Sequence, residues 1–588
     1  MGINNRISLP ASLSAAVGAE LGRWGENGFV GRLWLQDGTV WTGRDEGRWL
    51  GWLDVPARNG PMVDRLETFA DRLVHDGFLY AALLGMGGPV LFPQMLRQMF
   101  GQRRGIDLQI LDSTDPAQLT VFESGLDLRR TLFLVSSKSG TTLETQLFCR
   151  YFMAKLSDCV DPREVSSRFV AVTDAGSPLD QMATENGFRA VFHGDAEVGG
   201  RFSALSYFGM VPASIVGIDV GQMLDRARTM ADGCKPKVAV SNNPGVKLGV
   251  VLGTAGRLGY DKVTLVTSSG LPGLGVWIEQ VIAESTGKGG SGLIPIEGES
   301  LGSITDYGSD RLFVSIRLKD AIDVCQQEQL DRLEEAGHPV IRIELEDAYD
   351  IGAECFRWSF GTAVAGSILG VNPFNQPDVE ASKVAARAVT NDYAAGRKTS
   401  KRQPVAVASH RSGNVSSYVS GIYGKELSRL LPRDAPIDKW LRAHFQQLRD
   451  RDYVSILAYL EYCEPYRRLL DRVRLRIREE TDAATTVGFG PRYLHSTGQL
   501  HKGGPSNVLF LVVTCSDVVD VDVPGEVCSF GVVKDAQARG DEEVLAARQR
   551  RYLRLHLDGR IADGLSVVST LVEVALVSDT DGVGLGDN

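Results

Sequence analysis

Short apolar segments that alternate with helical stretches recur along most of the 588-residue chain. The clearest early examples are residues 79–84, 131–136 and 169–174. Apolar runs of this length, separated by helices, are typical of a parallel sheet covered by helices on both faces. The alternation starts again near residue 245, and a further α/β unit follows residue 400. The sequence therefore predicts an α/β protein built from consecutive units.

The length of the chain and the breaks in its strand–helix pattern divide it into four segments. Residues 1–65 look like a leading helical arm with five tryptophans. Residues 66–240 and 241–400 each read as one α/β domain, and a polar, charged stretch near residues 390–404 marks the next boundary. Residues 401–588 form a C-terminal α/β domain in this reading.

Composition narrows the function classes. The net charge of −10 argues against a broad nucleic-acid surface, which needs a basic face. The sequence has no run of 18 apolar residues and no basic, apolar leader, so we expect a cytoplasmic protein without a membrane span. The eight cysteines are scattered without a CxxC pair, which predicts neither a disulfide framework nor a metal site.

The strongest local signal is TLFLVSSKSGTTLETQ, residues 131–146. An apolar strand leads into a loop of hydroxyls, and a helix follows. Backbone N–H groups and the positive end of the helix converge at such a turn, which suits a dianionic phosphate. A helix cap is the alternative, but a cap needs one hydroxyl and this loop offers five. The candidate ligands are Ser137, Lys138, Ser139, Thr141 and Thr142.

Two glycine segments are weaker signals. Gly87 and Gly88 follow a predicted strand and would let a ligand approach the backbone, although a tight turn is the alternative. The G-x-G-x-x-G pattern is incomplete, so this is no dinucleotide fingerprint. Gly200 precedes Arg201, which could stabilise an oxyanion or lie on a surface loop.

Two helical segments carry further candidates. Gln280 and Glu284 lie four residues apart and share one helix face. Gln376 stands in a loop before a helix that begins near Pro377 and contains Lys383. Surface positions for Glu284 and Lys383 stay open as the alternative reading.

Four segments in order resemble the glucose-6-phosphate isomerase family: SSKSGTTLET, GGRFS, AESTGKGG and NPFNQPDVEASK. They span roughly residues 80–385. The Trp-rich N-terminus and YLHSTGQLHKGG, residues 493–504, look like the isomerase half of bifunctional transaldolase/glucose-6-phosphate isomerases. The resemblance implies two sugar-isomerase (SIS) domains with flavodoxin-like parallel sheets, plus the C-terminal α/β domain.

The resemblance also implies roles. Glu284 would move the proton between C2 and C1, and Arg201 would stabilise the enediolate. Lys383 would lie near the ring oxygen, whereas Gln280 and Gln376 would contact the sugar. The phosphate would bind the hydroxyl loop, with the glycine pair Gly87 and Gly88 lining the pocket. The family usually has serine after this pair, and this chain has Pro89.

A second departure concerns ring opening. The family usually uses a histidine from the neighbouring subunit, placed before the final Gln–Lys segment. Only His338 lies in that interval, and its context differs. We therefore predict that His495 or His501, in the C-terminal domain, replaces it. Turn and capping roles for these two histidines are the alternative.

The predicted function is isomerisation of glucose 6-phosphate and fructose 6-phosphate, a step of glycolysis and gluconeogenesis. No metal or redox cofactor is needed for that chemistry. The alternatives are an isomerase of another sugar phosphate, such as mannose 6-phosphate, or a non-catalytic sugar-phosphate sensor. A sensor would need only the phosphate loop. A homodimer and a functional link to a transaldolase are compatible with the resemblance.

Overall fold

The computed structural model describes residues 5–58, 60–103, 105–394, 403–411, 413–432 and 434–577. Its first sheet is parallel, with strand order β3-β2-β4-β5-β6. The bounds of these strands are Tyr80–Gly85 (β2), Asp107–Leu111 (β3), Thr131–Ser136 (β4), Phe169–Asp174 (β5) and Ala190–Gly194 (β6). In chain order this is the 2-1-3-4-5 arrangement of flavodoxin-like folds.

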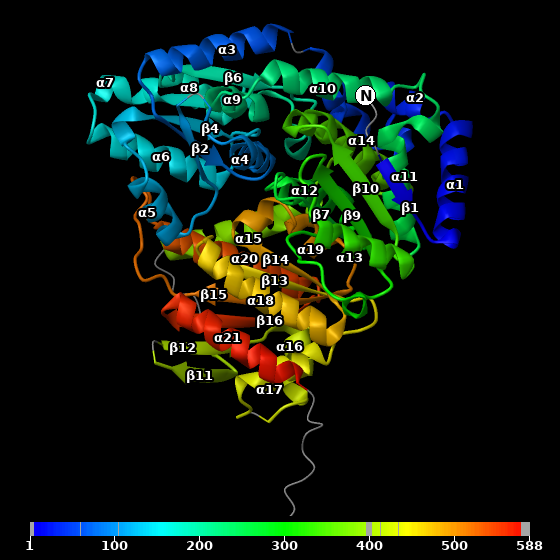
Figure 1. Ribbon diagram of the computed structural model, residues 1–588. Coiled ribbons are helices and arrows are strands. Elements are labelled where there is room, and N and C mark those ends of the chain that lie inside the picture. Colours follow the sequence, from blue (N-terminus) through cyan, green and yellow to red (C-terminus); the bar gives the residue numbers. More distant parts are fainter. Residues whose placement is uncertain are drawn as a thin grey trace, which may run out of the picture.

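Helices cover both faces of the first sheet (Figure 1). Their bounds are Gly60–His75 (α3), Gly88–Phe100 (α4), Pro116–Ser124 (α5), Leu143–Ser157 (α6), Pro162–Val165 (α7), Pro178–Glu185 (α8), Tyr207–Val216 (α9) and Val220–Gly233 (α10).

The second sheet has the order β1-β10-β9-β7-β8. Strands Lys262–Thr267 (β7), Ile294–Ile296 (β8), Arg311–Leu318 (β9) and Val340–Leu345 (β10) are parallel, and Asn5–Ser8 (β1) joins the edge antiparallel to β10. The accompanying helices are Ala11–Glu26 (α1), Phe29–Trp34 (α2), Pro244–Arg257 (α11), Leu274–Thr286 (α12), Val324–Glu335 (α13), Ile351–Leu369 (α14) and Pro377–Ala394 (α15).

The third sheet, β11-β12-β16-β15-β13-β14, lies below the other two in Figure 1. Its strands are Ala406–His410 (β11), Gly413–Tyr418 (β12), Tyr453–Tyr459 (β13), Ala484–Phe489 (β14), Val508–Cys515 (β15) and Arg551–Gly559 (β16). Its helices are Gly421–Arg429 (α16), Ile437–Phe445 (α17), Glu464–Thr481 (α18), Gly498–Gly503 (α19), Phe530–Ala547 (α20) and Ile561–Leu576 (α21).

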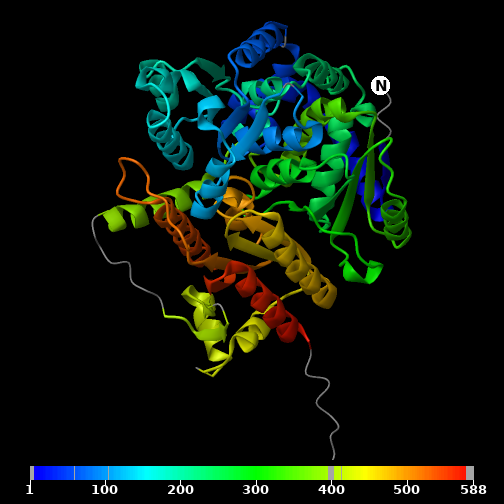
Figure 2. The same ribbon diagram turned by 60° about the vertical axis from the view of Figure 1, so that its left-hand side comes forward.

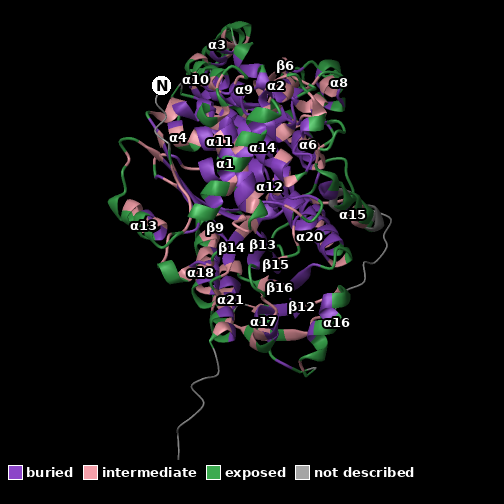
Figure 3. Cartoon of the chain, turned by 90° about the vertical axis from the view of Figure 1, so that its right-hand side faces the viewer, coloured by how far each residue is buried: buried purple, intermediate pink, exposed green. Residues whose placement is uncertain are grey.

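Helix α12 joins the three units. One continuous apolar core includes its residues Trp277 and Ile278, and it spans the first two sheets. A separate cluster places Ala283 of α12 against Tyr453 and Leu500 of the C-terminal domain. Figure 3 shows α12 buried in the middle of the molecule. Because α12 contacts all three units, sites between units can form at either of its ends and on two of its faces.

The C-terminal domain also contacts α15 of the second unit, through α20. These helices lie side by side, as Figure 2 shows for the lime-green and orange segments on the left. Gly540 of α20 has room for no side chain, because a Cβ there would lie 2.7 Å from the backbone nitrogen of Ala386. This close approach holds α15 against the C-terminal domain.

The α/β class with parallel-dominated sheets is confirmed. The N-terminal segment differs from the helical arm expected there, because β1 precedes its helices and extends the second sheet. Its tryptophans are packing residues: Trp24 and Trp52 are buried, and Nε1 of Trp41 donates to the carbonyl of Ala363 at 2.7 Å. Residues 395–402, at the expected boundary of the third domain, lie outside the described residues. None of the described helices is long and apolar enough to cross a membrane.

Candidate active site

The glycine turn and the hydroxyl loop lie side by side because they follow neighbouring strands. β2 ends at Gly85 and β4 ends at Ser136, and the two strands are paired. In this strand order they flank the point where the chain reverses direction across the sheet, and ligands of such sheets bind at the carboxyl ends of the strands there. The strand order thus places both predicted segments at one edge of the sheet.

The hydroxyls of the loop bond to one another. Oγ of Ser137 donates to Oγ1 of Thr142 at 3.0 Å, and the hydroxyls of Ser139 and Thr141 are 2.9 Å apart. Ser139 and Thr141 are exposed and face a cavity of about 670 Å³, including its open mouth. This phosphate-loop pocket is also lined by Glu144 and by residues of α15 and the C-terminal domain.

Lys138 points elsewhere. Its ammonium pairs with the carboxylate of Asp174 and donates to the carbonyl of Asp195 at 3.1 Å. The lysine therefore anchors the loop to the end of β5, and the hydroxyls and backbone of the loop face the pocket without it.

The glycine turn fixes the position of Arg201. A Cβ at Gly88 would lie 2.3 Å from the carbonyl oxygen of Gly200, so the two glycine segments pack backbone to backbone. Gly87 has φ +67°, and a Cβ there would approach the carbonyl oxygen of His495 and the amide of Gln280. A side chain at either glycine would push the catalytic candidates apart.

Arg201 is 3% exposed and fully engaged. Nε donates to Oγ of Ser285 at 2.7 Å, Nη1 donates to Oε1 of Gln376 at 3.1 Å, and Nη2 donates to the carbonyls of Pro373 and Asn375. Nη1 also lies 3.3 Å from Oε1 of Glu284. Burial lowers the pKa of Arg201 from its ordinary value, and the Glu284 carboxylate opposes that shift. The result is a fixed cation beside a carboxylate.

A chain of contacts runs from Glu284 to the phosphate loop. Nε2 of Gln280 donates to Oε2 of Glu284 at 3.2 Å and to the carbonyl of His495 at 2.8 Å. The ring Nε2 of His495 lies 2.9 Å from Oε1 of Glu144 in the first turn of α6. Oε1 of Gln280 is buried and has no partner among the described residues, so it can accept a bond from a ligand.

The segment before α15 supplies the other side of the site. Gln376 is exposed apart from its bond to Arg201. Lys383 lies two turns into α15, and its side chain is outside the described residues. Gln499 of the C-terminal domain fixes the start of this helix, since its amide donates to Asp378 at 2.6 Å and to the carbonyl of Gly287 at 2.9 Å.

The two candidate histidines of the C-terminal domain, His495 and His501, lie in different surroundings. His495 is in contact with Gln280 and Glu144, as described. His501 is 3% exposed on α19, between the rings of Tyr493 and Phe510, and it lines a different cavity. Burial, then Lys502, lower the pKa of His501 well below its ordinary value. Only His495 therefore contacts the other candidate residues, and a role for either histidine stays a prediction.

Three residues of the site were missed from the sequence. Glu144 holds His495, Ser285 holds Arg201, and Lys288 donates to the carbonyls of Ser285 and Asn372 at 3.0 and 2.6 Å. Burial, then Arg201, lower the pKa of Lys288 well below its ordinary value. All three stand inside the motifs SSKSGTTLET and AESTGKGG, which was the available signal.

Residues 80–292 match the family model described as Phosphoglucose isomerase. The glucose-6-phosphate isomerase of Pediococcus pentosaceus is 28% identical over 57% of this chain and 85% of its own length. That of Clostridioides difficile is 27% identical over the same shares. A hypothetical protein of Thermus thermophilus, 24% identical, superposes with a TM-score of 0.56 over 65% of this chain and 99% of its own.

The matched region holds the hydroxyl loop, Arg201, Gln280 and Glu284. The aligned share of the relatives exceeds two thirds of their length, so the likeness covers most of an isomerase and not one motif. Residues 80–292 are thus similar to the phosphoglucose isomerase family, and the chain as a whole resembles glucose-6-phosphate isomerases.

Proposed function

We propose that the chain interconverts glucose 6-phosphate and fructose 6-phosphate. The observation that carries this proposal is the contact of Glu284 with Arg201 and Gln280, which His495 and Glu144 link to the hydroxyl loop. A sensor would need the loop alone. An aldose–ketose shift needs a base and a fixed cation in addition, and both stand here.

In this mechanism the sugar's phosphate binds the exposed hydroxyls and backbone of the loop, beside the N-terminus of α6. Glu284 removes the proton from the carbon next to the carbonyl and returns it to the neighbouring carbon. Arg201 holds the negative oxygen of the enediolate, since its guanidinium is buried and already oriented by Ser285. Gln280 accepts from a sugar hydroxyl through Oε1.

Ring opening needs a group that can exchange a proton with the ring oxygen. His495 is our candidate, with Glu144 as the partner that orients its imidazole. The group then comes from the same chain as Glu284, through the C-terminal domain. Lys383 is proposed to assist near the ring oxygen. A homodimer and a link to a transaldolase stay expectations from the family resemblance.

A coupled assay of the purified chain tests the function. Fructose 6-phosphate should be converted to glucose 6-phosphate, read through glucose-6-phosphate dehydrogenase. Mannose 6-phosphate, assayed in parallel, should turn over far more slowly. Absence of turnover on fructose 6-phosphate, or preference for mannose 6-phosphate, would reject the proposal.

A further inference from the structure

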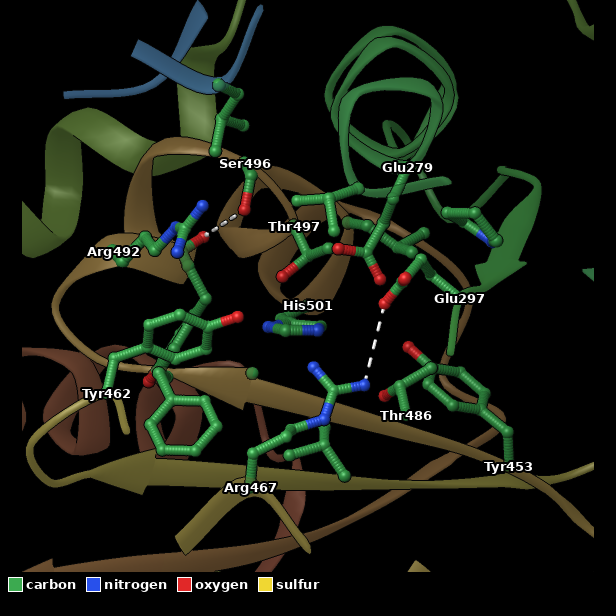
Figure 4. A pocket seen from close by; sticks show the side chains of 18 residues that line it. Glu279, Glu297, Tyr453, Tyr462, Arg467, Thr486, Arg492, Ser496, Thr497 and His501 are labelled. Atoms are coloured by element: carbon green, nitrogen blue, oxygen red, sulfur yellow. Dashed lines mark hydrogen bonds and ion pairs between the residues drawn. The ribbon is translucent and has the colours of Figure 1, made fainter. Parts of the chain in front are cut away.

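A second cavity lies on the other face of α12, between this helix and the C-terminal sheet. Together with its open mouth it occupies about 670 Å³. Glu279 and Val276 of α12 line one wall, and Thr486 of β14, Arg467 of α18 and His501 of α19 line the others. Figure 4 shows these polar groups directed toward a common space.

Two carboxylates meet there. Glu297 lies along α12 because Gly275 leaves room for it, as a Cβ at that glycine would be 2.8 Å from Cγ of Glu297. Glu279 stands one helical turn further on. Glu297 is paired with Arg467, whose Nη2 lies 3.6 Å from Oε2, but no hydrogen bond or ion pair to Glu279 is found among the described residues. The cavity thus contains one carboxyl group without an ion-pair partner, Glu279, beside a second one that is paired.

A buried imidazole faces the same space. His501 stands in the middle of the cavity in Figure 4. Its Nδ1 has no hydrogen-bond partner among the described residues, although the residue is 3% exposed. A buried polar atom without a partner costs free energy, roughly 1–3 kcal/mol, so a bound molecule that satisfies it would be favoured. Both open groups, Glu279 and His501, are therefore left for something that is not part of the chain.

The charged side chains around this cavity indicate which kind of ligand would fit it. Arg492 is held by Asp112 at 3.0 Å and lies over the ring of Tyr462, and Arg467 is held by Asp471 and Glu297. Both arginines are thus paired with carboxylates, whereas Glu279 has no ion-pair partner among the described residues. Burial, then Glu297, raise the pKa of Glu279 to about 8, opposed by Arg467, Arg474 and Arg492. A positive group between the two carboxylates would remove this repulsion.

A metal ion is a poorer fit than an ammonium group. No cluster of three His, Cys, Asp or Glu side chains arranged to hold a metal occurs among the described residues. An ammonium needs only two or three acceptors, and hydroxyls of Thr486, Ser496 and Thr497 line the same cavity. Hydroxyl groups on the ligand would find partners in these side chains and in Nδ1 of His501.

We propose that this cavity is a second binding site, separate from the isomerase site, for a small hydroxylated primary amine whose ammonium group pairs with Glu279 and Glu297. The site shares α12 with Gln280 and Glu284 but none of their contacts.

Calorimetric titration of the full chain tests this with four probes: ethanolamine and glucosamine, and their neutral counterparts ethylene glycol and glucose. At least one amine should bind, and its neutral counterpart should bind at least tenfold more weakly. Glu279→Gln should weaken the amine at least tenfold. Glu464→Gln, which removes an exposed carboxylate of α18, should leave its affinity unchanged.

A second variant guards against a folding defect. Val276→Phe narrows the cavity without removing a charge, and it should also weaken the amine while the thermal unfolding transition is kept. The proposal is overturned if neither amine binds at millimolar concentration, if the neutral probes bind equally well, or if Glu279→Gln retains full affinity in a folded protein. Binding of Mg²⁺ in place of the amines would overturn it as well.

Discussion

The two faces of α12 carry carboxylates in opposite situations. Glu284, in the last turn, is compensated by Arg201 at 3.3 Å and bonded by Gln280. Glu279, five residues earlier, faces Glu297 and has no such partner among the described residues. One helix therefore holds a carboxylate with a cationic partner on one face and a carboxyl group without an ion-pair partner on the other. Because both carboxyl groups stand on the same helix, the difference between their surroundings comes from the units that pack against each face.

The largest effect is expected at Glu284. Glu284→Gln should lower kcat by about 10⁴-fold, the upper end for loss of a general base. Binding of fructose 6-phosphate, followed by its thermal stabilisation of the protein, should survive. Glu279→Gln is the matched control on the same helix and should keep kcat within about threefold. Equal losses in the two variants would remove the distinction between the faces.

The two histidines extend the comparison to the C-terminal domain. His495→Ala should lower kcat by about 10²-fold, the lower end for an acid–base group. His501→Ala should change kcat little, since its ring lies in the other cavity. The coupled assay measures both. Wild-type turnover in His495→Ala would leave the ring-opening group unassigned.

Sequence and structure agree most closely where a strand leads directly into a motif. The strand at Thr131–Ser136 and the helix around Glu284 could be predicted because an apolar run ends at a polar loop. The strand Asn5–Ser8 could not, since it is short, polar and paired with residues more than 300 positions away. Edge strands of this kind carry little pattern of their own.

Side-chain direction was the main limit within the site. Lys138 stands among the loop hydroxyls in sequence, yet its ammonium reaches Asp174. His495 and His501 are six residues apart, but His501 lies within the short helix α19 and the two residues line different cavities. Glu144 contacts a histidine 351 positions later. Such pairings depend on tertiary contacts that no local pattern contains.

A substitution in the hydroxyl loop should have a smaller effect, and this effect should be on substrate binding. Ser139→Ala removes an exposed hydroxyl from the phosphate-loop pocket and should raise KM about tenfold, since a hydrogen bond to a charged group contributes about 1.5–3 kcal/mol. The value of kcat should change less. Ser157→Ala, at the far end of α6, is the control and should change neither constant. A lower kcat with unchanged KM in Ser139→Ala would contradict a binding role.

The smallest expected effect is on the pH dependence of thermal stability, and it comes from Glu279 on the other face of α12. The folded protein binds a proton on Glu279 up to about pH 8, whereas the unfolded chain releases it near pH 4.5. This group's contribution to the free energy of unfolding therefore falls as the pH rises through that interval. Glu279→Gln should gain thermal stability relative to wild type, by a few degrees, between pH 6 and pH 8.5. A Tm difference that is the same at both pH values would show that Glu279 titrates normally.

The central claim is that the face of α12 turned to Arg201 carries the base. Deuterium uptake at C2 of glucose 6-phosphate in D₂O, followed by NMR, tests it most directly, because uptake needs proton removal at that carbon. We predict exchange with the wild-type protein and with Glu279→Gln, and exchange about 10⁴-fold slower with Glu284→Gln. Exchange at the wild-type rate in Glu284→Gln would contradict the account.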